Sequence, residues 1–319
     1  MAWHRAEIAA ITQQPGAPTF DNSIAALERS GEALARVRRL FWTLSSAQAT
    51  PEIRAIEADI SARLSTHATA ISHDETLAAR VAEVHARRHE AGLSDEQIRL
   101  VETTHNGFLR GGSALEAPQK ARFAQIDARL AALSVQFGQN VLSATNAWIL
   151  DLGQEDLAGL PTSLRDTAAA RAAAGGAKGR YHVTLDRADY ERFLTFSDRR
   201  DLREEIWRAF AARCEGDAHD NWPVIAEILA LRQERAKLLG YGDFAQFVLD
   251  HSMAHSPDAA EGLLRRLWAP AKRRAAEEAA ELQALIDRDG GLDGTRGQAA
   301  RTALYLFERD AGVALLRSG

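Results

Sequence analysis

The chain has 319 residues, of which 46% are apolar and 26% are charged, and its formal net charge at neutral pH is -5. This apolar content excludes an intrinsically disordered protein, and the interspersed charges of a slightly acidic chain argue against nucleic acid as a partner. A single cysteine, Cys214, excludes an intramolecular disulfide and indicates a reducing, cytoplasmic compartment. No stretch reaches the length of a membrane span, so we expect no membrane partner.

The first third of the chain predicts four amphipathic helices. In residues 21–44, capping oxygens are followed by apolar residues three, four and seven positions apart, so we expect one helix with a single buried stripe. Thr50-Pro51 is a typical helix start, because threonine caps the first turn and proline suits it. A third helix is expected through residues 77–91, ended by Gly92, and a fourth after the capping box Ser94–Gln97.

The middle of the chain changes its pattern after one long helix. Pro118 opens this helix, and its six apolar positions have three- and four-residue spacing: Phe123, Ile126, Leu130, Leu133, Phe137 and Val141. Residues 148–152 and 181–185 are short and rich in residues that favour strands, so two strands are predicted. Between them an alanine-rich helix is expected to end at Gly175-Gly176.

Three more helices are expected in the last third. They begin after Ser197-Asp198, at Pro223 and after Ser256-Pro257, and Gly240 ends the second of them. The glycine-rich residues 290–297 predict a loop. The apolar stripes of these helices include Leu202, Ile206, Ile225, Leu229, Leu263 and Leu267.

These elements predict a mainly α protein, an antiparallel, bundle-like array of helices with one small β element. We divide it into an N-terminal helical domain at residues 1–146, a connecting region at residues 147–188 with both strands and a helix, and a second helical region at residues 189–319.

Two histidine pairs with helical spacing are the candidate metal ligands. His85 and His89 fall on a predicted helix, so both imidazoles are expected on one side of it, and His251 and His255 have the same spacing. Hydrolysis by a bound metal also needs a third ligand and a carboxylate base, and the positions where that base is diagnostic hold alanine and serine. We therefore interpret these residues as surface histidines and assign no catalytic residue.

Two other candidate signals are weaker. Cys214 has only His219 close to it in sequence, which is little support for a nucleophile. Ser113 follows Gly111-Gly112, and residues 175–179 are similarly glycine-rich, but neither has the lysine-containing pattern of a phosphate-binding loop. We interpret both as loops.

Three segments resemble the zinc oligopeptidases of the thimet oligopeptidase, neurolysin and bacterial peptidyl-dipeptidase family. They are PTFDNSIAALERSG, VTLDRADYERFLTFSDRRDLREEIWRAFAARC and ILALRQERAKLLGYGDFAQFVLDHSMAHSP, and the likeness extends over about residues 5 to 288. The resemblance implies the N-terminal half of a helical ellipsoid with a deep channel, in which complete enzymes bind one zinc ion and hydrolyse short peptides. Peptidyl-dipeptidases release C-terminal dipeptides, whereas oligopeptidases cut internally.

The zinc motif of that family, H-E-x-x-H, occurs nowhere in the 319 residues. Two histidines one turn apart hold the metal and the glutamate activates water, so we expect this chain to bind no zinc and to be inactive alone. Compared with that family, the front of the chain looks shortened and the residues after Gly291 no longer resemble it. We therefore expect a chain truncated before the motif, through a frameshift, a gene truncation or an unrelated tail. The alternative is a stand-alone pseudo-peptidase that binds peptides or a protein partner; a metal-binding protein using the histidine pairs would require stoichiometric zinc.

Truncation has a physical consequence for partners. Helices that normally pack against a catalytic half would expose apolar surface without it. We therefore expect either self-association or a partner that covers this surface. A monodisperse monomer in light scattering at high concentration would contradict this expectation.

Overall fold

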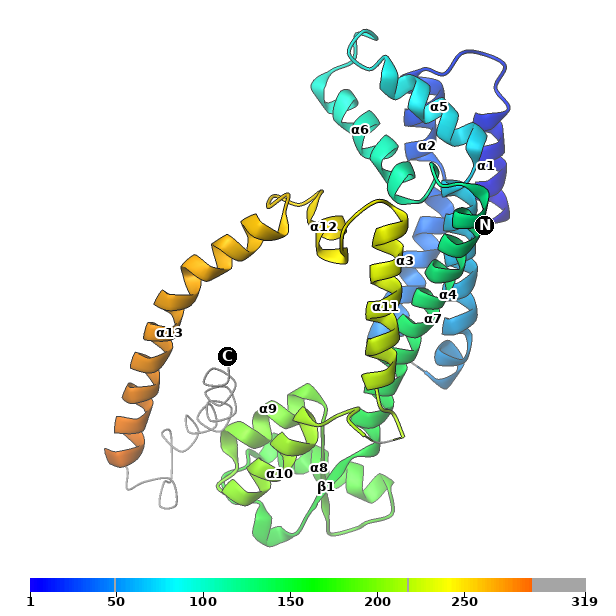
Figure 1. The fold of residues 1–319 in the computed structure, drawn as a ribbon. Helices are drawn as coiled ribbons and strands as arrows, with labels where there is room; N and C mark the ends of the chain where they lie inside the picture. Colours follow the sequence, from blue (N-terminus) through cyan, green and yellow to red (C-terminus); the bar gives the residue numbers. More distant parts are fainter. Residues whose placement is uncertain (49, 217, 289–319) are drawn as a thin grey trace. The chain divides into compact units, whose positions relative to one another are not determined.

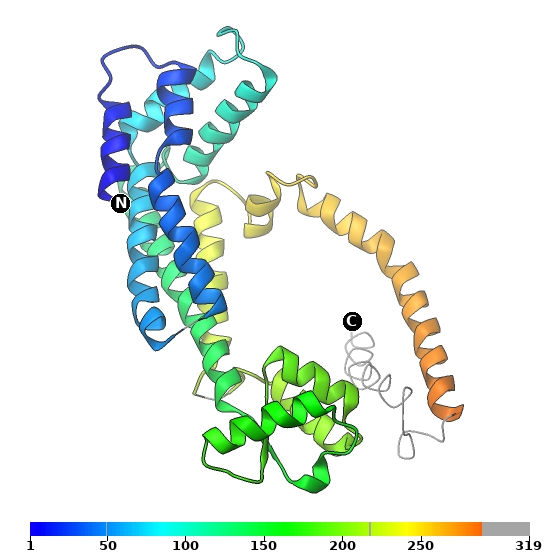
Figure 2. The ribbon, with the colours of Figure 1, turned by 180° about the vertical axis from the view of Figure 1, so that it is seen from behind.

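The computed structural model describes residues 1–48, 50–216 and 218–288 (Figures 1 and 2). These residues form mainly α-helices with one two-stranded sheet, which confirms the predicted fold class. In this part of the chain no helix is both long and apolar enough to cross a membrane. The elements are α1 (Ala2–Thr12), the π-helix η1 (Phe20–Ala25), α2 (Ala26–Arg29), α3 (Glu32–Ala47), α4 (Pro51–Ser72), α5 (Glu75–Ala86), α6 (Asp95–Arg110), α7 (Ala117–Ala147), β1 (Ile149–Leu152), the 3₁₀ turn η2 (Gln154–Asp156), α8 (Thr162–Ala174), β2 (Tyr181–Thr184), α9 (Arg187–Phe196), α10 (Arg200–Ala211), α11 (Trp222–Leu238), α12 (Phe244–Leu249) and α13 (Pro257–Arg288).

The chain divides into two compact units, each built from two stretches of sequence. Unit 1 comprises residues 1–139 and 223–253, and unit 2 comprises residues 140–222 together with the described residues from 254 onward. The long helices α7 and α11 contain two of the boundaries, so both units are discontinuous in sequence. The three consecutive domains expected from the sequence remain a prediction about the organisation of the chain.

The core of unit 1 lies where α1, η1, α5 and α6 meet. Two caps position its helices. Asp74, which was not predicted as a cap, accepts a hydrogen bond from Leu77 N at 2.8 Å, and Ser94 and Gln97 form the expected capping box. The apolar faces of these elements then bury one cluster, formed by Ile8, Ile11, Ile24, Leu77, Val81, Val84, Val101 and Phe108.

The single helix predicted over residues 21–44 is wrong, because the chain breaks at Ser30-Gly31. Gly31 adopts a left-handed φ of 72°, which glycine tolerates and most residues do not. Helix α1 stabilises the break: Glu7 Oε2 accepts a hydrogen bond from Gly31 N at 2.8 Å, and a Cβ at position 31 would lie 2.7 Å from the His4 ring. The expected buried stripe also does not continue past the break, since Ile24 is buried but α3 buries none of its residues.

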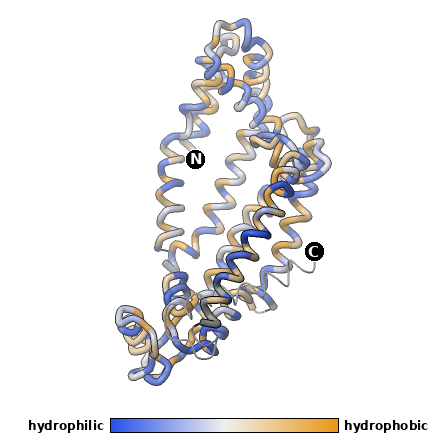
Figure 3. The backbone as a smooth tube through the Cα atoms, turned by 90° about the vertical axis from the view of Figure 1, so that its left-hand side faces the viewer, coloured by the Kyte–Doolittle hydropathy of each residue, from blue (hydrophilic) through white to orange (hydrophobic). Residues whose placement is uncertain are grey.

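Other boundaries differ more locally. Helix α4 starts as predicted, with Thr50 accepting a hydrogen bond from Ile53 N at 3.3 Å. Helix α5 ends at Ala86 rather than at Gly92, and turns fill the interval. Helices α1 and α12 have no counterpart among the predicted elements. Figure 3 shows apolar and polar residues interleaved along the helices, as their amphipathic sequences require.

Unit 2 is built around the predicted pair of strands. β1 and β2 pair antiparallel, with Leu150 opposite Val183 and Leu152 opposite Tyr181. One face of the pair is buried with α8, α9 and α10 in a second cluster that includes Leu152, Leu164, Val183, Phe193, Leu194 and Ile206. The alanine-rich helix α8 ends before Gly175, as predicted. The short sheet therefore anchors three helices.

Two predictions in the last third need correction. Ser197 does not cap α10, since it terminates α9 and is buried, and Arg199 occupies the N-cap of α10. Helix α13 begins at Pro257 as predicted, with Ser256 Oγ accepting from Ala259 N at 3.2 Å. Its expected apolar stripe is not buried in this part of the structure, since Leu263 and Leu267 are at least 50% exposed. The loop predicted at residues 290–297 lies outside the described residues.

Acidification is expected to destabilise unit 1 through buried imidazoles. His67 Nε2 lies 3.0 Å from His4 Nδ1, and His4 Nε2 lies 3.2 Å from Ser30 Oγ. Burial lowers the pKa of both rings below 6.5, and the nearby positive charges of His4, the N-terminus and Arg5 lower the pKa of His67 further. The unfolded chain therefore binds more protons between the lowered values and 6.5, so stability is lost as pH falls through this window.

Urea unfolding at pH 7.5 and pH 5.5 measures this effect, and a lower midpoint is expected at pH 5.5. Replacing His67 with glutamine should reduce the difference between the two midpoints. Replacing the exposed His89 with glutamine is the matched control and should leave it unchanged. A midpoint in the unaltered chain that does not fall at pH 5.5 would contradict this explanation.

Candidate functional site

Helices α7 and α11 of unit 1 form the wall of a groove. Arg122 pairs with Glu234 and Arg129 pairs with Glu227, each through two hydrogen bonds of 2.6 and 2.7 Å. Residue numbers rise along one helix as they fall along the other, so the helices are antiparallel. The exposed pairs contribute little to stability individually, but their fork-to-fork geometry fixes the register of the two helices.

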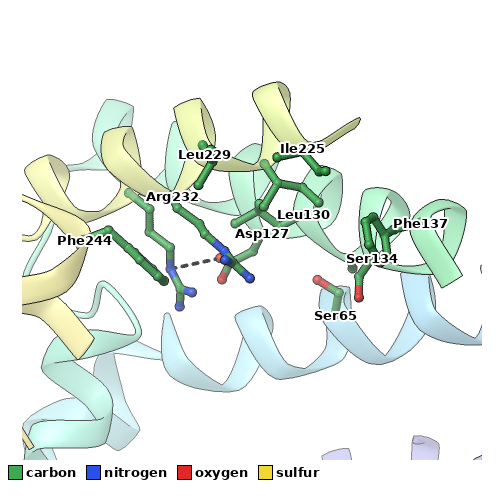
Figure 4. Close-up of a pocket in the computed structure, with 12 residues that line it drawn as sticks. Ser65, Asp127, Leu130, Ser134, Phe137, Ile225, Leu229, Arg232 and Phe244 are labelled. Atoms are coloured by element: carbon green, nitrogen blue, oxygen red, sulfur yellow. Dashed lines mark ion pairs between the residues drawn. The ribbon is translucent and has the colours of Figure 1, made fainter. Parts of the chain in front are cut away.

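The groove has a volume of 640 Å³ and lies over α7, between α4 and α11 (Figure 4). Its walls are largely apolar because both helices carry apolar residues three and four positions apart. Volumes of this size hold small ligands or a few residues of a peptide. The apolar lining residues are Leu130, Ala131, Phe137, Ile225, Ile228, Leu229 and Phe244.

An ion pair lies at one end of the groove. Arg235 Nε is 3.2 Å from Asp127 Oδ1, and both side chains are largely buried. This Nε has no hydrogen-bond partner of good geometry, so the contact is an ionic attraction rather than a directed bond. Burial raises the pKa of Asp127, while the positive charge of Arg235 and the neighbouring His73 oppose that rise. Arg235 also lies over the Phe123 ring at 5.1 Å.

Arg232 is the cation in the groove that a ligand can use. Its guanidinium carbon lies 5.1 Å from the centre of the Phe244 ring, a cation–π contact that leaves the charge in place. The carboxylates of Glu234 and Asp127 pair with Arg122 and Arg235 rather than with Arg232. Ser65 of α4 and Ser134 of α7 add hydroxyl groups to the lining. The groove can therefore bind an apolar ligand that carries a negative group.

The residues of the structure do not fit a zinc site. In the part of the chain that is described, no group of three or more His, Cys, Asp or Glu side chains is placed to hold a metal ion. Asp127, the carboxylate of the groove, faces Arg235 rather than a second ligand. The groove is thus suited to binding, and it contains no arrangement that would activate water.

The candidate histidines do not lie one turn apart on a helix, which is the arrangement that metal binding would use. His85 is in the last turn of α5, and its ring stacks on His105 with 4.0 Å between centroids. His89 follows the end of that helix and is exposed, so the expectation that both imidazoles share one helix face is wrong. His251 and His255 also lie outside helices, in the segment after α12.

The glycine-containing segments are helix ends. After α6, Ser113 N donates to Phe108 O and Gly112 N donates to Leu109 O, which is a Schellman cap. The same pair of bonds closes α8 at Gly176 and Ala177. Cys214 is buried after α10 with a positive φ, and its carbonyl accepts a hydrogen bond from Asn221 N. These features stabilise chain reversals.

The residues of the groove were not predicted as a site. Leu130, Phe137 and Leu229 were interpreted as buried stripes, and Leu229 is 58% exposed. Spacing along one helix identifies an apolar face but does not say which other element covers it. Arg232 and Phe244 come together only through the fold. The sequence shows only that the two residues are close along the chain, which does not predict a binding site.

Comparisons with known proteins give the relationships of the chain. Residues 193–300 match the Peptidase family M3. The dipeptidyl carboxypeptidase of Salmonella typhimurium is 35% identical over 90% of this chain and 42% of its own length, and that of Escherichia coli is 35% identical over 91% and 43%. Oligopeptidase A of Salmonella typhimurium is 32% identical over 87% of the chain and 42% of its own length.

The helical chain is therefore related to peptidases, and the resemblance seen in its sequence is confirmed. The match to the M3 peptidases lies in its later part, at residues 193–300. The chain spans less than half the length of the curated relatives it matches.

Proposed function

We propose that this chain is the N-terminal part of a zinc-dependent M3 peptidase that acts on short peptides in the cytoplasm, and that it does not hydrolyse peptides alone. The similarity to dipeptidyl carboxypeptidases over 90% of the chain carries this proposal. The absence of H-E-x-x-H from the 319 residues carries its second half, since zinc hydrolysis requires metal ligands and a base. Zinc would belong to the complete enzyme, outside the residues present here.

A second candidate function is peptide binding without cleavage, and the groove of unit 1 favours it. Its apolar walls suit the side chains of an extended peptide, and the charge of Arg232 suits a carboxylate. Binding of this kind needs no metal. Both functions require the same scaffold, so a chain that binds but does not cut is consistent with the first function and is sufficient for the second.

Peptide binding in the groove can be tested at Leu229. We expect Leu229→Glu to weaken binding of a fluorescent apolar peptide with a free C-terminus by about tenfold or more, because a Leu contact is worth about 1.5–3 kcal/mol when buried. Fluorescence anisotropy measures this affinity. Leu229 is exposed in the unliganded chain, so the variant should still fold.

Leu40→Glu is the matched control. Leu40 is 61% exposed, similar to Leu229 at 58%, but it lies on α3 and does not line the groove. It should leave peptide affinity unchanged. Equal losses in both variants, or no loss in Leu229→Glu, would remove the groove as the peptide site.

A further inference from the structure

A second cavity in unit 1 lies against helix α6 and shares no residue with the groove. It has a volume of 310 Å³. Five of its lining residues are three, four or one positions apart along α6, so they share one helix face. His251, in the turn after α12, provides the other side. The α6 residues are Arg99, Thr103, Asn106, Gly107 and Arg110.

The lining of this cavity is cationic and polar. It contains two guanidinium groups and an imidazole, and none of the lining residues is a carboxylate. Two carboxylates lie beside the lining residues. Glu102 accepts a hydrogen bond from Arg88 at 3.2 Å and is 3.9 Å from Arg99, and Asp250 accepts a hydrogen bond from Tyr241 at 2.8 Å. Asp250 also lies 3.7 Å from His251. Arg110 is the guanidinium group of this lining that a negative ligand can meet.

Arg110 is held in place at the inner end of the cavity. Its Nη1 donates to Phe247 O at 2.7 Å, and its guanidinium carbon lies 3.8 Å from the centre of the Phe247 ring. Arg110 also forms a side-chain hydrogen bond with Tyr241. A guanidinium group has five N–H donors, so these contacts fix its orientation and still leave donors for a ligand. A pre-oriented arginine of this kind is suited to binding an oxyanion through two parallel bonds.

Gly107 leaves space at the same place. It lies inside α6, where glycine is less favourable than alanine, and nothing lies within 4 Å of the position that a Cβ would take. The neighbouring Asn106 also lines the cavity and can donate through its amide. The helix thus presents an open, unhindered surface beside Arg110.

We propose that this cavity binds a small oxyanion, the phosphate or carboxylate group of a ligand, between Arg110, Asn106 and His251 and over Gly107. Arg99 lies about 16 Å from Arg110 along the axis of α6, at 1.5 Å per residue, so it attracts the anion from the rim without sharing the contact. The site shares no lining residue with the groove, so it does not depend on the peptide binding proposed for the groove.

Isothermal titration calorimetry of the full chain with inorganic phosphate, at constant ionic strength, tests the proposal. We expect saturable binding with a dissociation constant of about 1 mM. A parallel titration with acetate separates a phosphate site from a carboxylate site, and either anion satisfies the proposal. The absence of saturable binding for both anions would overturn it.

Gly107→Leu places a side chain in the open space and should weaken anion binding at least tenfold. Gly138→Leu is the matched control, because Gly138 is also inside a helix, in α7, with nothing within 4 Å of its Cβ position. It lines neither cavity and should bind the anion as the unaltered chain does. Thermal unfolding of both variants confirms that they fold. Unchanged binding in Gly107→Leu, or equal loss in both variants, would contradict the site.

Discussion

Replacing Asp189 with alanine is expected to destabilise unit 2 by about 3 kcal/mol, the lower end of the range for breaking a buried ion pair. Asp189 is 6% exposed, and its Oδ2 accepts hydrogen bonds from Arg171 Nη1 at 2.7 Å and from Thr184 Oγ1 and N at 3.0 and 3.2 Å. One carboxylate thus joins α8, β2 and α9. Its removal leaves a guanidinium and a strand N–H without their partner.

The lower end of that range applies because the Arg171 side chain is 31% exposed and keeps some hydration. Its Nη1 also donates to His182 O at 2.7 Å, a bond that survives the substitution. Urea unfolding followed by hydrogen exchange at the amides of β2 measures the effect. Asp189→Asn retains an acceptor for Thr184 and should cost less than Asp189→Ala.

Asp151→Ala provides a matched control in the same unit. Asp151 pairs with Arg180 through hydrogen bonds of 2.8 and 2.9 Å, but both side chains are about half exposed. Exposed ion pairs contribute little to stability, so this variant should remain close to the unaltered chain. Equal destabilisation by the two substitutions would show that burial does not determine the contribution of Asp189.

Local signals in the sequence predicted many of the helix starts correctly. Thr50 and the Ser94–Gln97 box cap helices as expected, and the two strands, with α8 between them, have the predicted order. These features depend on residues a few positions apart, which lie within one sequence window. Local chemistry therefore located the elements well.

Signals that depend on distant residues were missed. The break at Gly31 is stabilised by Glu7 and His4 of α1, so a regular apolar pattern across residues 21–44 was interpreted as one helix. In the same way, Ser197 has the chemistry of an N-cap but ends α9. A tertiary contact accompanies the break at Gly31, whereas the hydrogen bonds of Ser197 are to nearby residues such as Phe193 and Arg199.

The candidate site was the least predictable part. The groove requires α4, α7 and α11 to be placed together, and its Asp127–Arg235 pair joins residues that are far apart in the chain. The histidine spacing predicted that His85 and His89 share a helix face. Helix α5 ends before His89, so the helical spacing does not apply to this pair. Binding surfaces between helices have no short motif, whereas the absent zinc motif could be recognised from sequence alone.

The largest functional effect expected is the absence of peptide hydrolysis. Enzymes accelerate their reactions by at least about 10⁶-fold, and a zinc peptidase obtains this from a metal-bound water and a base. The sequence contains no H-E-x-x-H, and the described residues contain no cluster suited to a metal. The chain should therefore leave peptides uncut at any zinc concentration, while binding them in the groove.

Mass spectrometry of peptides incubated with the purified chain tests this account most directly. The chain should be assayed with one equivalent of zinc and with a chelator, beside the Escherichia coli dipeptidyl carboxypeptidase, a relative of 35% identity, as the positive control. The account predicts intact peptides in both assays of the chain and shortened peptides in the control. Zinc-dependent shortening by the chain itself would contradict it, and loss of that activity in variants of His85 or His251 would then identify the metal ligands.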